Sequence, residues 1–262
     1  MRAMLTGTIA ALSLIGTCHA AMVSRTLDYE VDGKKMQSAL VYDDAGAKRP
    51  GLVMAPDWMG MNPDQIELAK HYAGKDYVVL VADVYGVDQR PKNPDEAGAA
   101  TKAMYADRNA LRARINAALA QLRGQVGKAP LDGQHFAAFG FCFGGATVLD
   151  LARSGAEVAA VVSFHGNLAS DDVTMAKNIK SKVLAMNGAD DKFVSPEQIA
   201  TFQKEMTDAK VDWQFLNYSG AVHCFAIPTA HGQVPGCEYN ERTARRSALQ
   251  MRNFLNEAFA GK

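Results

Sequence analysis

Cys142 and the glycines around it form the stretch of the chain with the clearest capacity for chemistry. The hexapeptide GFCFGG, residues 140–145, lies between an apolar run of strand type at 135–139 and a helix-like segment at 146–153. Its frame G-x-C-x-G matches the nucleophile elbow G-x-S-x-G, with sulfur in place of oxygen. Glycines two residues to either side are needed because side chains there would collide with the strand and the helix.

A turn of this kind places the Cys142 side chain above a sheet and at the N-terminus of the following helix. Unpaired backbone N–H groups at a helix N-terminus favour negative charge, so they stabilise a thiolate and leave donors for an oxyanion. The alternative is a buried, unreactive cysteine in a glycine-rich connection. The acidic residues and the histidine further along the chain favour the interpretation of Cys142 as a nucleophile.

A cysteine nucleophile of acyl transfer needs a base and a group that orients the base. In enzymes with a nucleophile elbow, the acid and then the histidine follow the nucleophile along the chain. An apolar run at 182–186 leads to Asp190 and Asp191, and another at 211–216 leads to His223. The order predicts His223 as the base and leaves Asp190 and Asp191 as alternatives for the acid.

The remaining residues indicate neither a metal site nor a nucleic-acid partner. His165 follows a buried run, where it either lines the mouth of a cleft or makes a structural hydrogen bond. No pair of histidines has metal-ligand spacing, so we predict no metal. The chain has 28 basic and 28 acidic residues and no basic stripe, which excludes the nucleic-acid-binding class.

Residues 1–20 have the pattern of a secretory signal peptide that is cleaved after Ala20. A short basic start precedes an apolar run at 3–16, and small residues occupy the cleavage positions. The weaker alternatives are a lipoprotein signal at Cys18 and a cytosolic tail. We therefore expect a periplasmic or secreted protein without membrane contact after cleavage, in an oxidising compartment.

The mature chain, residues 21–262, would hold three cysteines. An odd number in an exported protein indicates one reactive thiol and one bridge. A Cys224–Cys237 disulfide is the candidate because it leaves Cys142 free.

The elements that must position these residues alternate between strands and helices. Two extended runs flank Asp32-Gly33, a sequence typical of a hairpin turn. Unalternating apolar runs between helices predict a parallel sheet covered on both faces. We predict one doubly wound, mostly parallel α/β domain, with strands at 25–31, 35–42, 51–55, 77–82, 135–139, 158–164, 182–186 and 211–216, and helices that begin near 62, 93, 146, 195 and 240.

Five motifs together resemble the dienelactone hydrolase family: APDWMGMN at 55–62, ADVYG at 82–86, GFCFGG at 140–145, DKFV at 191–194 and HCF at 223–225. The resemblance extends over essentially the whole mature chain. It implies an α/β-hydrolase fold and a Cys142-His223-Asp191 triad that hydrolyses carboxylic esters or lactones through an acyl-thioester, without a cofactor. The family's acid begins the motif acid-x-Phe-Val, which selects Asp191 over Asp190.

The resemblance also implies how the site is completed. The family's oxyanion donors are backbone amides that correspond to Trp58 and Phe143. A family glutamate that contacts the cysteine and controls its ionisation is replaced here by Asp57.

The substrate expected from the resemblance is a small neutral molecule. Family members that act on dienelactone hold its carboxylate with two arginines, and Val87 and Ile227 occupy those places here. A buried carboxylate without its partner loses about 2–5 kcal/mol of binding. We therefore expect a neutral ester, lactone or thioester in an apolar cleft that includes Tyr85 and Phe225. We also expect a monomer; the alternatives are a non-catalytic, ligand-binding member of the fold and a redox thiol at Cys142.

Overall fold

β1 (Met22–Val31) and β2 (Lys34–Asp43) open the computed structural model, which describes residues 21–261. The two strands pair antiparallel around the turn Asp32-Gly33. Both turn residues have positive φ, 49° and 73°, as a two-residue hairpin of this kind requires. The hairpin predicted from the Asp-Gly pair is confirmed.

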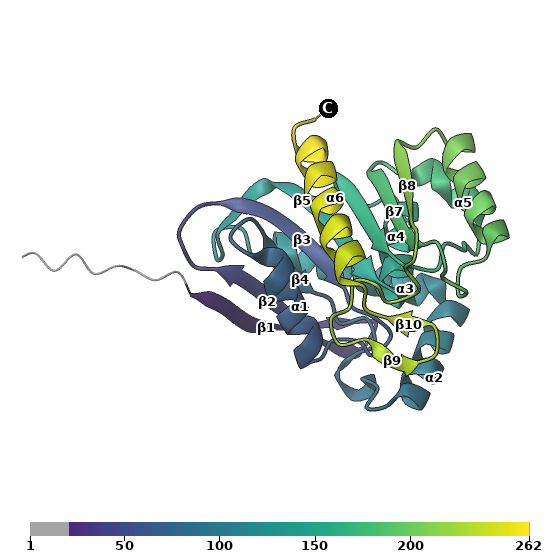
Figure 1. Ribbon diagram of the computed structural model, residues 1–262. Helices are drawn as coiled ribbons and strands as arrows, with labels where there is room; N and C mark the ends of the chain where they lie inside the picture. Colours follow the sequence, from purple (N-terminus) through teal and green to yellow (C-terminus); the bar gives the residue numbers. More distant parts are fainter. Residues whose placement is uncertain (1–20, 262) are drawn as a thin grey trace, which may run out of the picture.

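Six further strands continue the sheet, and their order brings the candidate site residues to one edge (Figure 1). The order is β1-β2-β4-β3-β5-β6-β7-β8, in which β2 pairs antiparallel with β4 and all later pairs are parallel. This confirms the predicted mostly parallel α/β domain. The strands are β3 (Arg49–Ala55), β4 (Val78–Val81), β5 (Leu131–Phe141), β6 (Ala160–Phe164), β7 (Lys182–Gly188) and β8 (Trp213–Tyr218).

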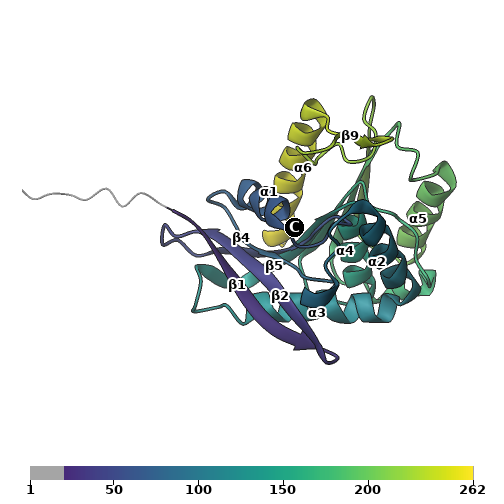
Figure 2. The ribbon, with the colours of Figure 1, turned by 90° about the horizontal axis from the view of Figure 1, so that it is seen from below.

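Helices cover both faces of the sheet because successive strand residues alternate between two apolar cores. Leu52 and Met54 of β3 face α1 (Pro63–Ala73) and α6 (Glu241–Phe259), whereas Val53 and Ala55 face the opposite layer. That layer contains α2 (Pro94–Ala106), α3 (Arg108–Arg123), α4 (Phe143–Arg153) and α5 (Pro196–Asp208). Figure 2 shows α1 and α6 on one side of the sheet and α3 and α4 on the other.

Helix starts follow the cap residues that the sequence indicates. Asn62 accepts a hydrogen bond from the Gln65 N–H, and Pro63 occupies the first helical position of α1. Ser195 and Gln198 form a reciprocal capping box at the start of α5.

Four short elements were not predicted. They are the 3-10 turns η1 (Val87–Gln89) and η2 (Val173–Asn178) and the two-stranded hairpin of β9 (His231–Val234) and β10 (Cys237–Glu238). The hairpin residues are mostly polar and exposed, so no apolar alternation marks them in the sequence. β10 adjoins the candidate base, because the Glu238 N–H donates to the His223 carbonyl over 2.9 Å.

The predicted signal peptide, residues 1–20, lies outside the described residues. Within residues 21–261, no helix combines the length and the apolar character that crossing a membrane would require.

Candidate active site

Cys142 occupies the junction between β5 and α4 in a backbone conformation that side chains rarely adopt. Its φ is 54° and its ψ is −117°. The Cys142 N–H donates to the Phe164 carbonyl over 3.0 Å and lies 3.1 Å from the Nδ1 atom of His165. These contacts from the end of β6 hold the strained turn in place, as expected where the surrounding structure over-determines a functional residue.

The glycines of this turn leave room for neighbouring backbone. A Cβ atom on Gly140 would lie 2.3 Å from the Gly144 carbonyl oxygen, and one on Gly144 would lie 2.0 Å from the Ala55 carbonyl oxygen. Only glycine therefore lets the end of β5, the start of α4 and the end of β3 approach this closely.

His223 and Asp191 form a buried pair beside the cysteine. The Nδ1 atom of His223 lies 2.8 Å from Oδ2 of Asp191, and Oδ1 of Asp191 accepts from the Phe193 N–H over the same distance. Asp190 is exposed, so the structure pairs His223 with the second of the two adjacent aspartates. Asp191 follows the end of β7, and His223 lies in the loop after β8.

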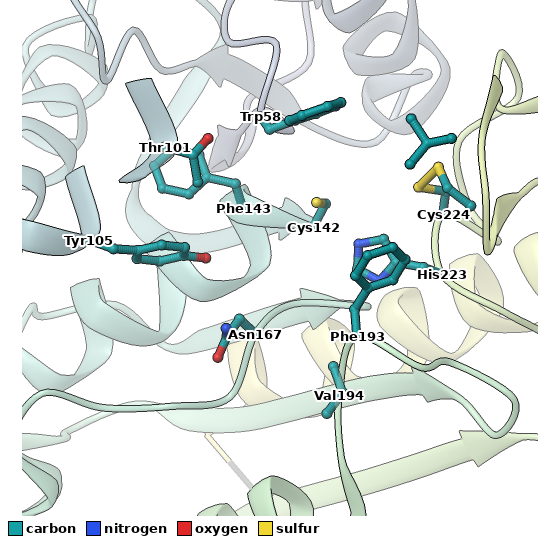
Figure 3. Close-up of a pocket in the computed structure, with 12 residues that line it drawn as sticks. Trp58, Thr101, Tyr105, Cys142, Phe143, Asn167, Phe193, Val194, His223 and Cys224 are labelled. Atoms are coloured by element: carbon teal, nitrogen blue, oxygen red, sulfur yellow. A yellow bond between two sulfur atoms is a disulfide. The ribbon is translucent and has the colours of Figure 1, made fainter. Parts of the chain in front are cut away.

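The charges of the site favour a protonated imidazole. Burial by itself would lower the pKa of His223, but the negative charges of Cys142 and Asp191 and their hydrogen bonds outweigh it and raise this pKa to about 10. Because Nδ1 donates to Asp191, Nε2 is the nitrogen available to Cys142 or to a bound substrate. Figure 3 shows the Cys142 sulfur and the His223 ring beside each other in the cavity.

Two backbone amides near Cys142 are available as oxyanion donors. Phe143 is the first residue of α4, where an N–H has no partner within the helix. The Trp58 N–H donates to no other group in the described part of the chain. Both residues line the cavity that contains Cys142.

Asp57 supports the Trp58 turn. Its Oδ1 atom accepts from the Met59 N–H and its Oδ2 atom accepts from Nε2 of Gln65, each over 2.9 Å. Burial raises the pKa of Asp57 to about 6. No hydrogen bond joins this carboxylate to Cys142 within residues 21–261, so its observed contacts position the turn rather than the nucleophile.

The cavity at Cys142 has a volume of about 270 Å³. None of the described residues that line it is Asp, Glu, Lys or Arg, so apart from Cys142 and His223 it offers only neutral contacts. The lining consists of Trp58, Thr101, Tyr105, Cys142, Phe143, Asn167, Phe193, Val194, His223, Cys224, Val234 and Cys237.

A second cavity of about 200 Å³ adjoins the first and shares Trp58 and Cys142 with it. Ile227, which the sequence predicted to contact the substrate, lines this second cavity. Asp57 and Gln233 give it more polar character than the first.

The other three residues predicted to contact the substrate line neither of these cavities. The Tyr85 ring stacks on Phe143 with centroids 5.6 Å apart, and its hydroxyl donates to the Trp58 carbonyl. Tyr85 therefore holds Trp58 and Phe143 in place without lining the cavity. Val87 lies in η1 and is 40% exposed. Phe225 is fully buried in the core cluster that also contains residues of α6.

A disulfide joins Cys224 to Cys237, the pairing that the cysteine count indicated, and Cys142 is a free cysteine. The bridge ties the residue after His223 to β10. It thereby closes the loop that carries the candidate base and forms part of the cavity wall.

His165 has a role that the sequence left open. It is fully buried, and burial together with the charge of His223 lowers its pKa well below the usual range. The neutral ring can therefore accept the Cys142 N–H at Nδ1. The sequence signal was its position directly after a buried strand, where parallel sheets place site residues.

Tyr105 and Asn167 also line the cavity and were not predicted. Tyr105 lies on α2, far from any motif, and carried no signal in the sequence. Asn167 follows β6 and could have been found by the same rule as His165. In residues 21–261, no group of three or more His, Cys, Asp or Glu side chains is arranged to hold a metal ion.

Residues 37–259 match the sequence profile described as "Dienelactone hydrolase family". A dienelactone hydrolase-like promiscuous phosphotriesterase from metagenomic libraries, solved by crystallography, is 36% identical, with a TM-score of 0.84 over 91% of this chain and 99% of that chain. A carboxymethylenebutenolidase from a Pseudomonas species is 25% identical over 240 residues, which cover 88% of this chain and 95% of the relative. An uncharacterized protein of Caenorhabditis elegans is 35% identical over 161 residues, 60% of this chain and 100% of the relative.

Proposed function

Since the chain belongs to the dienelactone hydrolase family and is a carboxylic ester or lactone hydrolase, we propose that it cleaves its substrate through an acyl-thioester on Cys142. The observation that carries the proposal is the buried His223–Asp191 pair, 2.8 Å long, beside a free cysteine at a helix N-terminus. These are the parts that nucleophilic acyl transfer needs.

In the first half of the reaction, the Cys142 thiolate attacks the carbonyl carbon and forms the S–C bond. The carbonyl oxygen becomes an oxyanion and accepts hydrogen bonds from the Trp58 and Phe143 amides. As the C–O bond breaks, Nε2 of His223 gives its proton to the departing oxygen. The Trp58 and Phe143 amides, which have no other hydrogen-bond partner in the described part of the chain, support the oxyanion role, and the raised pKa of His223 supports its role as the proton donor.

In the second half, neutral His223 takes a proton from water, and the resulting hydroxide attacks the thioester. The C–S bond breaks, the acid product leaves and the thiolate-imidazolium pair is restored. Asp191 orients the imidazole and stabilises its charged form throughout, and the neutral His165 holds the Cys142 amide in its strained turn.

The substrate that fits this cleft is a neutral ester or lactone with an apolar acyl group. The described residues that line the cavity of about 270 Å³ include no Lys or Arg, and the His223 imidazolium is already paired with Asp191 and Cys142, so a carboxylate finds no free cationic partner there. This supports a substrate less acidic than dienelactone.

The test is a panel of neutral aryl esters and lactones with the wild type and with Cys142→Ala. We expect the variant to lose at least about 10⁴-fold in kcat. Mass spectrometry of the quenched wild-type reaction should find the acyl group on the peptide that contains Cys142. Full activity in Cys142→Ala, or acylation elsewhere, contradicts the proposal.

Phosphotriester hydrolysis is a second candidate activity. The relative that is 36% identical is described as a promiscuous phosphotriesterase. The neutral cleft favours it here, since a phosphotriester is uncharged and its phosphoryl oxygen can use the same amides. A neutral aryl phosphotriester in the same panel tests it, and turnover that survives Cys142→Ala would assign it to another site.

We also propose that the protein is exported. The Cys224–Cys237 disulfide supports this, because disulfides persist mainly in oxidising compartments. The assembly state proposed is a monomer.

A further inference from the structure

The cavity at Cys142 carries two polar side chains to which the proposed mechanism gives no task. Tyr105 on α2 and Asn167 after β6 line the same cavity as Cys142. Figure 3 shows the Tyr105 hydroxyl directed into the cavity, with Cys142 between Tyr105 and His223. Both residues are neutral and both can donate a hydrogen bond.

The position of the Tyr105 hydroxyl is fixed by contacts around its ring. The ring packs edge-on against Phe143 with centroids 5.5 Å apart, and the Arg108 guanidinium lies 5.0 Å from its centre. Arg108 is itself held by Asp150 over 2.9 Å. Burial and the nearby negative charge of Cys142 raise the pKa of Tyr105, so the hydroxyl keeps its proton. It has no hydrogen-bond partner among the described residues.

The amide of Asn167 is fixed in a similar way. Its Oδ1 atom accepts from the Ala169 N–H over 2.9 Å, which sets the orientation of the side chain. Nδ2 is then the atom that Asn167 offers to the cavity, and in the part of the chain that the structure describes it donates to no other group. Tyr105 and Asn167 thus provide two preoriented donors in a mostly apolar chamber, where the hydroxyl of Thr101 is already hydrogen-bonded to that of Tyr85.

The direction of the reaction decides which part of a substrate meets these donors. The leaving oxygen must accept a proton from His223, so the alcohol side lies on the His223 side of Cys142. The acyl chain takes the opposite side. Resting on the proposed function, we propose that Tyr105 and Asn167 bind an uncharged oxygen, a keto or ether oxygen, within the acyl chain of the substrate.

The chemistry of the chamber favours a neutral oxygen over a carboxylate. A carboxylate can accept the same two hydrogen bonds, but it would lose its hydration in a mostly apolar chamber whose cation, the His223 imidazolium, is already paired with Cys142 and Asp191. A plain hydrocarbon chain would leave both donors without partners when it displaces water from them, which also costs affinity. The preferred substrates are therefore neutral oxo- or alkoxy-substituted esters and lactones.

The test compares aryl hexanoates with ether isosteres in which the methylene at the third, fourth or fifth carbon of the acyl chain is replaced by oxygen. Each kcat/KM is divided by the hydroxide-catalysed rate of the same ester to remove intrinsic reactivity. For at least one position, we expect the wild type to prefer the ether by about fivefold. Tyr105→Phe and Asn167→Asp should reduce this ratio toward one, since Asp keeps the Ala169 contact but loses the donor.

Tyr42→Phe is the matched control, because it removes a half-buried hydroxyl from β2 that lines neither cavity, and it should keep the wild-type ratio. A wild-type ratio of one at every position, or an unchanged ratio in Tyr105→Phe, overturns the inference while ester hydrolysis itself stands. Absence of any wild-type turnover overturns the proposed function and the inference together.

Discussion

Replacing Gly144 by alanine should abolish most ester hydrolysis while Cys142 stays reactive. The added Cβ atom would lie 2.0 Å from the Ala55 carbonyl oxygen and 2.4 Å from that of Pro56. Both atoms belong to the backbone, so no side-chain rotation can relieve the contact. The start of α4 and the chain after β3 must separate.

The size of the effect follows from this displacement. Because Cβ atoms essentially never approach other atoms within 3.0 Å, the two segments must move apart by about 1 Å. One segment carries the Phe143 amide and the other leads directly to the Trp58 amide, so the movement pulls the two oxyanion donors apart. A misplacement of about 1 Å costs about 10²-fold, and loss of one donor costs about 10²–10³-fold in kcat. Overpacking should also lower the free energy of unfolding by about 1–3 kcal/mol.

The assay separates the oxyanion donors from the nucleophile. Hydrolysis of a neutral aryl ester needs both, whereas alkylation of Cys142 by iodoacetamide needs only the thiolate. We expect Gly144→Ala to lose about 10²–10³-fold in kcat and to keep an alkylation rate within about threefold of the wild type. Gly98→Ala on α2 is the matched control, because nothing lies within 4 Å of its added Cβ atom. This control should keep full activity and gain about 0.5–1 kcal/mol in stability.

Two outcomes would refute this reasoning. The first is a folded Gly144→Ala variant, shown by its thermal transition, that hydrolyses the ester at the wild-type rate. Trp58 and Phe143 would then not act as a spaced pair of donors. The second is an equal loss of alkylation and hydrolysis, which would place the damage at Cys142 itself.

Two further predictions concern the pH profile and the compartment. The His223 proton is held below its raised pKa of about 10 and lost above it, so kcat/KM should fall as the pH rises through about 10. Asp191→Asn removes one of the charges that raise this pKa, so the fall in kcat/KM at alkaline pH should begin about one to two pH units lower. A profile that does not move would contradict the pairing of Asp191 with His223 in the reaction. Expressed as residues 1–262 in a bacterium with a periplasm, the protein should be recovered there beginning at Ala21, with one free thiol per chain on Cys142. Three free thiols, or a chain that retains residues 1–20, would contradict export.

The sequence by itself determined the fold and the three residues proposed for the chemistry. Apolar runs of strand length, separated by helix caps, predict a parallel sheet because each signal lies within a few neighbouring residues. The glycines around Cys142 similarly mark a turn whose cause is local. Cys142, an aspartate at 190 or 191, and His223 each follow a strand, and parallel strands present their carboxyl ends at one edge, so these residues are expected to lie together. The resemblance to the dienelactone hydrolase family then selected Asp191.

Only the tertiary structure decided what surrounds those residues. Tyr85 and Phe225 were expected in the cleft, yet one supports Phe143 from behind and the other lies in the core beside α6. Tyr105 and Asn167 face Cys142 although 62 sequence positions separate them and neither belongs to a motif. The direction of a side chain depends on the twist of the sheet and on how loops and helices pack over it. These contacts join segments distant in the chain, so apart from the position of Asn167 after a buried strand no local pattern encodes them.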